Sequence, residues 1–241
     1  MKITAVRTCV FNEQEDLPAF ILRHIPTVQE GTVLAVASKL FALWKGKVIA
    51  DASPCAKEAL IRRESDFALP TPLAWFTVKD GMVMTNAGID VSNAAGKLLL
   101  LPPHLYEWAA QLRKTLQQHW GVARLGIVVT DSLILPLRAG VIAGAVAYSG
   151  FKGVRDLRGQ PDLFGRPLQT TLVDVADSLA TAAALCMGEG AESQPLACIE
   201  DANVQFVDEV DPNEIKYSME NDLYAPLLKA AGYRKKGDQH D

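Results

Sequence analysis

Polar residues interrupt the apolar runs of this chain in two segments, and each segment carries a carboxylate. The first is VMTNAGIDVSN, residues 83–93, with Asp90 near its end. The second is LGIVVTDSLILPLRAG, residues 125–140, in which Asp131 and Ser132 close a strand-like apolar run. Two carboxylates brought close repel each other unless a proton or a cation lies between them. Carboxylate and hydroxyl oxygens suit Mg²⁺ or Mn²⁺, so the pattern predicts a metal site. The alternative is a local Asx turn at Asp90 and a capping role for Asp131.

Further candidate ligand contacts lie in glycine-containing and basic segments. The segment MGEGAESQP follows a long predicted helix, and its small residues would let the backbone approach a ligand closely, although an ordinary helix stop explains it as well. Arg138 stands in an apolar run, where an unpaired guanidinium is costly, so we expect it to meet a carboxylate or a phosphate. The other clustered cations are Lys39, Lys45, Lys47, Lys152, Arg155, Arg158 and Arg166.

Composition excludes several classes of protein. The 241 residues carry a net charge of −4, without the basic excess typical of nucleic-acid binders. The longest apolar window, residues 126–149, is broken by charged residues, proline and glycine, so we expect no membrane span and no signal peptide. The four cysteines form no C-x-x-C pair, which predicts buried, reduced thiols in a cytoplasmic protein. Walker A, G-x-G-x-x-G and G-x-S-x-G motifs are absent.

The elements that must position these residues alternate irregularly between strand and helix. We predict strands in the segments 2–11, 31–38, 124–132, 141–150 and 194–201, and a hairpin around Asp80-Gly81. Helices are predicted at 15–25, 53–69, 104–120 and 170–188, with partial helix at 211–232 and a loop at 151–168. This order favours an α+β fold with mixed sheets and flanking helices. Residues 1–235 are expected to form one catalytic unit, with a division into two lobes left open, and residues 236–241 a frayed tail.

Six segments occur in one order and at one spacing that together resemble a known family. They are NAGIDVSN, LLLLPP, GIVVTDS, RAG, DLRGQPDLFGRPL and VADSLATAAALCMGEG. The chain resembles the coenzyme F420-0:L-glutamate ligase family, most closely over residues 81–200. That resemblance implies an intertwined homodimer with an α+β fold of its own. It also implies a GTP-dependent ligase that joins L-glutamate to the carboxylate of a phospholactate-bearing deazaflavin through an acyl phosphate. The expected cofactors are two Mn²⁺ or Mg²⁺ ions and a monovalent cation such as K⁺.

The resemblance assigns roles to particular residues. Asp90, Asp131, Ser132 and Gly190 fall on metal-contacting positions, and Asp90, Asp131 and Arg138 are the expected catalytic residues. The expected nucleotide contacts are Ser38, Lys39, Asn93, Gly188, Glu189, Gly190, Ala191, Glu192, Ser193, Gln194 and Pro195. Phosphoryl transfer depends mostly on positioning and electrostatics, so this chemistry needs no protein nucleophile.

The match breaks at a few positions that bear on the substrate. A family lysine falls on Leu43 and a family glutamate on Lys45, with Lys45 and Lys47 as the nearby cations that could reach the same phosphate. A family Gly-Arg pair is replaced by Ile134 and Leu135. Losing a guanidinium should weaken recognition of an anionic substrate. We therefore expect a divergent ligase that joins L-glutamate or a similar amino acid to a carboxylate, either that of the deazaflavin or a different one. An inactive nucleotide- and metal-binding paralogue and a two-metal phosphohydrolase are the alternatives.

Overall fold

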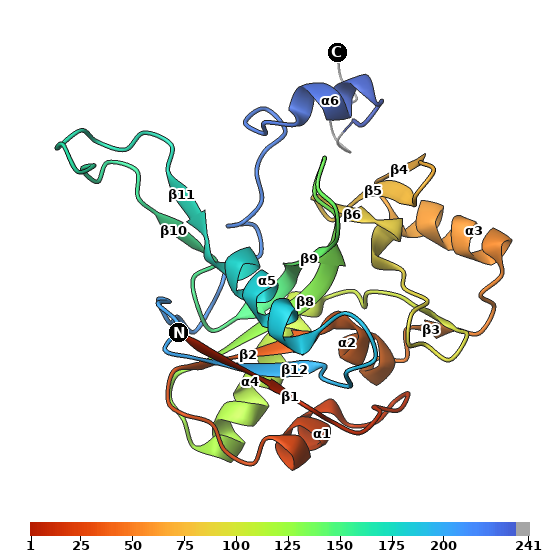
Figure 1. Ribbon diagram of the computed structural model, residues 1–241, viewed down its shortest axis with the longest axis horizontal. Coiled ribbons are helices and arrows are strands. Elements are labelled where there is room, and N and C mark those ends of the chain that lie inside the picture. Colours follow the sequence, from red (N-terminus) through yellow and green to blue (C-terminus); the bar gives the residue numbers. More distant parts are fainter. Residues whose placement is uncertain (235–241) are drawn as a thin grey trace. The chain divides into compact units, whose positions relative to one another are not determined.

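The computed structural model describes residues 1–234, so the predicted tail at 236–241 lies outside the described chain. The chain divides into two compact units, each built from two stretches of sequence (Figure 1). Unit 1 comprises Met1–Val48 and Leu100–Ile215, and unit 2 comprises Ile49–Leu99 and the chain from Lys216 onward. No helix within residues 1–234 is long and apolar enough to cross a membrane. The grouping of residues 1–235 into one catalytic unit stays a prediction.

Unit 1 is built on a five-stranded sheet in the order β1-β12-β2-β8-β9 (Figure 1). Strands β2 and β8 are parallel, whereas the other neighbouring pairs of this sheet are antiparallel. A mixed sheet flanked by helices confirms the predicted α+β class. The strands are β1 (Lys2–Val6), β2 (Thr32–Ala37), β8 (Leu125–Leu133), β9 (Ile142–Ser149) and β12 (Leu196–Glu200).

Helices cover both faces of this sheet, with α5 on one side and α1 and α4 on the other (Figure 1). Because side chains alternate along a strand, Leu34 and Val36 of β2 pack into one core cluster and Val33 and Ala35 into the other. Burial on both faces explains why the segment TVLAVA is apolar throughout. The helices are α1 (Leu17–His24), α2 (Ser38–Trp44), α4 (Leu105–Trp120) and α5 (Val175–Met187).

Helix α5 is fixed to the sheet by polar contacts as well as by small buried side chains. Ala180 and Ala183 are fully buried against the sheet. The Asp177 carboxylate accepts a hydrogen bond from the backbone N–H of Ala145 in β9 at 2.8 Å. Asp174 caps the helix by accepting the N–H of Asp177 at 2.9 Å. This cap places the start of α5 at Val175, five residues after the predicted start of the helix at 170.

Two local predictions in unit 1 were wrong. The predicted loop at 151–168 contains β10 (Val154–Asp156), which pairs with β11 (Leu172–Asp174) in a hairpin that projects from the sheet (Figure 1). These strands have only three residues each, too few to show an alternating pattern in the sequence. Ser38 and Lys39 do not end a strand but begin α2, a seven-residue helix that the sequence reading missed.

The cysteines are reduced as predicted, but burial was wrong for three of them. Cys9, Cys55 and Cys186 are exposed, and Cys198 is half-buried. Burial raises the pKa of the Cys198 thiol to about 11, with a further contribution from the nearby Glu200 carboxylate. The apolar residues that flank each cysteine in the sequence therefore did not predict whether its side chain is buried.

Unit 2 contains the predicted hairpin and the predicted capped helix. Asp80 and Gly81 have φ values of 52° and 78°, as a two-residue hairpin turn requires. Ser53 caps α3 by accepting the N–H of Ala56 at 3.3 Å, and the helix ends at Glu64, before the predicted end at 69. Strand β3 (Val48–Ile49) has one residue in each unit. The other elements of unit 2 are α3 (Pro54–Glu64), β4 (Phe67–Pro70), β5 (Trp75–Lys79), β6 (Met82–Thr85), η1 (Asn86–Gly88), β7 (Leu98–Leu99) and α6 (Ala225–Ala230).

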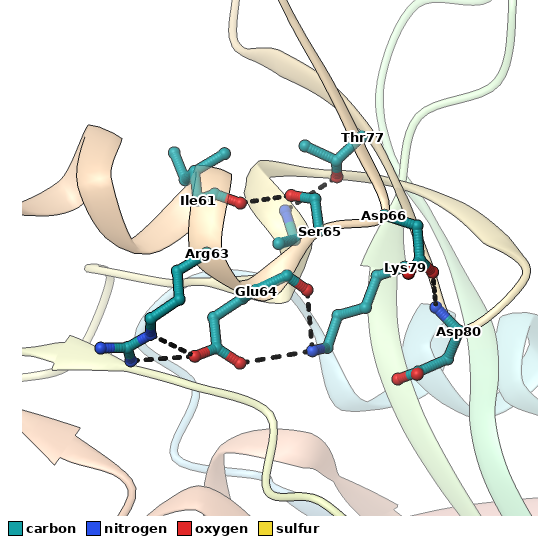
Figure 2. A network of polar contacts seen from close by, with 9 residues as sticks. Ile61, Arg63, Glu64, Ser65, Asp66, Thr77, Lys79 and Asp80 are labelled. Atoms are coloured by element: carbon teal, nitrogen blue, oxygen red, sulfur yellow. Dashed lines mark hydrogen bonds and ion pairs between the residues drawn. The ribbon is translucent and has the colours of Figure 1, made fainter. Parts of the chain in front are cut away.

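Figure 2 shows how the end of α3 is tied to the three-stranded sheet β4-β5-β6. The Lys79 ammonium donates to the backbone carbonyl of Glu64 at 3.0 Å and lies 3.4 Å from the Glu64 carboxylate. Arg63 binds the other carboxylate oxygen of Glu64 at 2.9 Å. Asp66 accepts the backbone N–H of Asp80 at 3.0 Å, which closes the network across the hairpin. These contacts fix the end of α3 against the β5–β6 hairpin, from which the polar loop continues.

The Asp174 cap gives a testable dependence of stability on pH. Burial raises the pKa of Asp174 to about 6, and the neighbouring Asp177 charge raises it further. The backbone hydrogen bonds that Asp174 accepts oppose this rise. The folded protein thus holds this proton more tightly than the unfolded chain, so ionisation of Asp174 lowers stability as the pH rises towards neutrality. Asp174→Asn keeps the capping oxygen and removes the charge. We expect a small rise in Tm near neutral pH, of at most about 2 °C because the side chain still reaches solvent.

The measurement is thermal unfolding of Asp174→Asn and wild type at about pH 7.5 and about pH 5. The gain in Tm should shrink at the lower pH, where the wild-type carboxyl is protonated. Asp174→Ala is the control, because it removes the charge together with the cap and should lower Tm at both values. An equal gain for Asp174→Asn at both pH values would contradict the assignment.

Candidate active site

The parallel pairing of β2 and β8 brings two predicted site residues into contact. Ala37 of β2 is in register with Thr130 of β8, so the residues that follow them lie side by side at one edge of the sheet. The Ser38 hydroxyl donates a hydrogen bond to the Asp131 carboxylate at 2.8 Å. Ser38 is 4% exposed, which fixes the hydroxyl in place. The predicted metal-binding carboxylate of unit 1 is therefore held by a buried side chain from the first residue of α2, which directly follows β2.

A second hydroxyl–carboxylate contact lies next to the first. The Ser132 hydroxyl donates to the Glu189 carboxylate at 2.8 Å, which joins β8 to the loop after α5. Asp131 and Ser132 are consecutive in an extended strand, so their side chains leave opposite faces of the backbone. If metal ions bind here, the Asp131 and Ser132 side chains would therefore contact different ions.

The loop at 188–195 has a specific backbone conformation. Gly188 has a φ of 82°, and a Cβ there would lie 2.5 Å from the side chain of Glu192, so this position requires glycine. Glu192 accepts the backbone N–H of Gly190 at 2.8 Å and closes the turn. Ala191 and Ser193 are exposed, and Ser193 also adopts a positive φ of 56°.

Backbone hydrogen bonds tie this loop to the edge that carries Ser38. The carbonyl of Pro195 accepts the N–H of Ala37, the last residue of β2, at 3.0 Å. The carbonyl of Ser193 accepts the N–H of Thr8 at 2.8 Å, and Gln194 between them is half-buried. The predicted nucleotide segments at 38–39 and 188–195 and the Asp131–Ser132 pair consequently meet at one edge of unit 1.

The donor atoms at this edge fit a hard divalent cation. Asp131 and Glu189 supply carboxylate oxygens and Ser132 a hydroxyl, the ligand types that Mg²⁺ and Mn²⁺ prefer. Gly190 has no side chain, so only its carbonyl could serve as a ligand, and Glu189 is chemically the better candidate. Sequence reasoning had placed Glu189 only among the nucleotide contacts. Within residues 1–234, no group of three or more His, Cys, Asp or Glu side chains forms a ready-made metal cage.

Arg138 lies in a different setting from the one predicted. It belongs to the exposed hairpin loop 134–141 between β8 and β9, not to a buried apolar run. Its backbone N–H donates to the carbonyl of Leu135 at 3.3 Å, while the preceding Leu137 is fully exposed at a φ of 58°. No carboxylate in the described chain forms an ion pair with the Arg138 side chain. The prediction that Arg138 lies in a buried apolar run was therefore wrong, whereas its contact with a phosphate and its catalytic role stay predictions.

Asp90 and Asn93 belong to unit 2 and lie in the polar loop that follows η1. The Asp90 carboxylate accepts the N–H of Ser92 at 2.6 Å, which is the Asx turn considered as an alternative to metal binding. The backbone of Asp90 also pairs with Leu99 through hydrogen bonds of 3.0 and 2.9 Å. Asn93 has a positive φ of 54°, a conformation that asparagine tolerates. The joint role of Asp90 with Asp131 in metal binding stays a prediction.

The lysines that follow β2 differ in how they are held. Lys39 is half-buried in the first turn of α2. The Lys45 ammonium lies between two indole rings, 3.4 Å from the centroid of Trp44 and 3.3 Å from that of Trp108. Burial lowers the pKa of Lys45, and the Asp16 charge opposes this effect. The aromatic faces attract the Lys45 ammonium, whereas Lys47 is exposed. A phosphate contact of either lysine stays a prediction.

Comparison with known proteins identifies the family of this chain. A family model described as F420-0:Gamma-glutamyl ligase matches residues 5–201. A protein of Archaeoglobus fulgidus named coenzyme F420:L-glutamate ligase is 32% identical over 238 residues, covering 91% of this chain and 94% of that protein. The protein of the same name from Methanopyrus kandleri is 35% identical over 196 residues, covering 73% and 77%. The Halorubrum lacusprofundi protein is 31% identical over 211 residues, covering 78% and 81%.

The Lys45 contact predicts a structural role that mutation can separate from ligand binding. Lys45→Met keeps the aliphatic volume and removes the charge, so it should lower the free energy of unfolding by about 1 kcal/mol. Urea unfolding measures this loss, and Lys47→Met at the exposed neighbour is the matched control with little expected change. Titration of Mn²⁺ and GTP into Lys45→Met should give wild-type affinity. A large loss of nucleotide affinity with unchanged stability would show that Lys45 contacts the ligand instead.

Proposed function

Because the chain belongs to the F420-0:gamma-glutamyl ligase family, whose members are glutamate ligases, we propose that it forms an amide between L-glutamate and a small-molecule carboxylate at the expense of a nucleoside triphosphate. We further propose GTP as the nucleotide, with two Mn²⁺ or Mg²⁺ ions and a monovalent cation such as K⁺. The observation that carries this proposal is the shared edge of β2 and β8, where Ser38 binds Asp131 beside Ser132 and the loop 188–195.

The proposed reaction has two balanced steps. An oxygen of the substrate carboxylate attacks the γ-phosphorus of GTP, an O–P bond forms, the bond to the β-phosphate oxygen breaks, and GDP leaves. The amino nitrogen of glutamate then attacks the acyl carbon, the carbon–oxygen bond to phosphate breaks, and the amine loses a proton. When bound, the divalent cations would neutralise the triphosphate charge. The residues described here contribute by holding positions, because phosphoryl transfer is accelerated mainly by alignment and electrostatics.

Each side chain at the edge has a distinct part in that alignment. Ser38 keeps the Asp131 carboxylate oriented through its 2.8 Å hydrogen bond, and Ser132 does the same for Glu189. A carboxylate has about four acceptor sites, so each can keep this partner and still bind a cation. Gly188 and Ser193 in the loop 188–195 have positive φ values. We propose that backbone N–H groups of this loop bind phosphate oxygens.

The departures from the family pattern bear on the acyl substrate. Leu43, which replaces a family lysine, is half-buried and packs against the core of unit 1, so its position no longer offers a cation. Ile134 and Leu135 are exposed in the loop after β8, 38% and 43% respectively. Apolar side chains there favour a carboxylate substrate that is less charged than a phospholactate. We therefore propose a ligase whose acyl substrate differs from that of the curated relatives.

A single screen tests the proposed activity. Purified protein with Mn²⁺ is incubated with L-glutamate, a panel of candidate carboxylates and either GTP or ATP, and products are identified by mass spectrometry. A ligase releases one phosphate per amide and needs all three reactants. Phosphate release without an acceptor would instead show a phosphohydrolase, and nucleotide binding without any turnover would show an inactive paralogue.

Asp131 provides the sharpest mutational test of the site. Asp131→Asn keeps the shape and an acceptor for Ser38 but removes the charge, so metal-dependent nucleotide affinity and amide formation should each fall at least about 100-fold. Calorimetric titration with GTP, with and without Mn²⁺, measures the first and the ligation assay the second. Glu58→Gln on the exposed face of α3 makes the same chemical change and should alter neither. Wild-type metal dependence in Asp131→Asn would remove this residue from the metal site.

A homodimer is part of the proposal, and the β10–β11 hairpin supplies an observation that supports it. Leu163 and Phe164 near its tip are 99% and 90% exposed, an unusual place for large apolar side chains unless another molecule covers them. We expect sedimentation at micromolar concentration to show a dimer, and Phe164→Ser to weaken it at least about tenfold. Leu73→Ser, at a similarly exposed leucine in unit 2, is the control. A stable wild-type monomer would rule the dimer out.

A further inference from the structure

A groove of about 660 Å³ lies in unit 1 beside the β10–β11 hairpin. It is lined by residues of that hairpin, by the first residue of α5, and by the segments around 152, 204 and 214. Its volume falls within the range of small-molecule sites. None of the residues assigned to the Ser38–Asp131 edge lines it, so the proposed ligase chemistry leaves this groove without a role.

The groove is separate from the Ser38–Asp131 edge. At its N-terminus α5 is joined to the groove, because the N–H of Val175 donates to the carbonyl of Gly153 at 2.8 Å. At its C-terminus the same helix leads into the loop 188–195. A helix of 13 residues spans about 20 Å, so a small ligand cannot occupy both places at once.

Cations dominate the polar lining of the groove. Lys152, Arg155 and Arg158 face two carboxylates, Asp156 and Glu214, which leaves one positive charge in excess. Arg158 holds Asp156 through contacts of 2.6 and 2.9 Å and lowers the pKa of that carboxyl to about 2. Arg155 donates to the backbone carbonyl of Asn203, and no carboxylate of the described chain forms an ion pair with it. Arg155 is consequently the guanidinium available to an anionic ligand.

Glu214 is engaged by its own partners and does not neutralise Arg155. One of its oxygens accepts both the Tyr148 hydroxyl, at 2.7 Å, and the N–H of Gly153, at 2.5 Å. The other oxygen lies 3.8 Å from the Lys152 ammonium. A Cβ on Gly153 would come within 2.3 Å of the Tyr148 hydroxyl, so glycine is required for this packing. Glu214 is thus fixed by Tyr148, Gly153 and Lys152 and does not form an ion pair with Arg155.

The remaining lining selects among anions. Gln160 and Gln205 add side-chain amides, which pair well with the amide groups of a ligand. Val154, Leu172, Val175 and Val204 add apolar surface, which suits methylene groups. A ligand that combines carboxylates, amides and methylenes matches this lining better than a bare phosphate, because a phosphate leaves the amide and apolar surfaces unused.

We propose that this groove is a second binding site, which takes a short oligocarboxylate of amide-linked glutamate units. The choice of glutamate rests on the proposed function, since each turnover of a glutamate ligase leaves an amide-linked glutamate on the product. The existence of an oligocarboxylate site does not depend on catalysis, because Arg155, Lys152 and the two glutamines are present whether or not the Ser38–Asp131 edge is active.

Calorimetric titration of the full-length protein with γ-glutamylglutamate, without nucleotide or metal, tests the proposal. We expect saturable binding that is at least tenfold tighter than that of L-glutamate or inorganic phosphate. Arg155→Gln should weaken it at least tenfold, and Arg155→Lys should weaken it less, because it retains the charge. Arg124→Gln, which removes an exposed guanidinium elsewhere in unit 1, is the matched control and should bind as wild type does.

Three results would overturn the proposal: no binding of γ-glutamylglutamate, unchanged binding in Arg155→Gln, or phosphate binding as tight as that of the diglutamate. Thermal unfolding of each variant checks that the fold is intact, and Arg155→Lys keeps the test decisive if Arg155→Gln unfolds. The ligation screen is run on the same preparations. Absence of amide formation contradicts the proposed function, whereas the titration alone decides the groove.

Discussion

The candidate site of unit 1 depends on one constraint, the parallel register between β2 and β8. Parallel strands end at the same edge of a sheet, so pairing Ala37 with Thr130 sets Ser38 beside Asp131. β12 runs antiparallel to β2, so its beginning, and with it the loop 188–195, arrives at that edge too. A shift of one residue in the β2–β8 register would turn Asp131 to the opposite face and separate it from Ser38. Burial of β2 on both faces is what makes this register hard to change.

The polar groups at this edge are oriented by hydrogen bonds within the protein. Each carboxylate has a partner within the protein: a hydroxyl for Asp131 and Glu189, and a backbone N–H for Glu192. Partners of this kind restrict rotation of the carboxylates, and preorganised groups stabilise a developing charge without reorganising. The same logic applies to Glu214 at the floor of the groove, where a tyrosine hydroxyl and a backbone N–H hold the carboxylate.

The substitutions relative to the family pattern are accommodated by the fold. Leu43 joins the core cluster, and the Lys45 ammonium lies between Trp44 and Trp108, so neither position leaves a buried charge without a partner. Ile134 and Leu135 lie in an exposed loop, where apolar replacements cost little stability. These positions therefore differ from the family pattern without disturbing the packing of unit 1.

The sequence alone determined the α+β class, most of the longer elements and the family. Long periodic segments such as α4 and the apolar run of β2 report their own structure, because burial of one face or of both leaves a pattern in the residues. It also singled out Asp131, Ser132 and the loop 188–195, since polar residues that interrupt apolar runs are costly without a purpose.

Only the tertiary structure decided which of these side chains meet. The contact of Ser38 with Asp131 joins residues that are 93 positions apart in the sequence, and the contact of Ser132 with Glu189 joins residues that are 57 positions apart. The exposure of Arg138, the short strands β10 and β11 and the position of Lys45 between two tryptophans were likewise settled by packing. Local sequence contains the periodicity of each helix or strand, so it predicts these elements. Strand register and side-chain partners depend on segments that are distant in the sequence and become neighbours only when the chain folds.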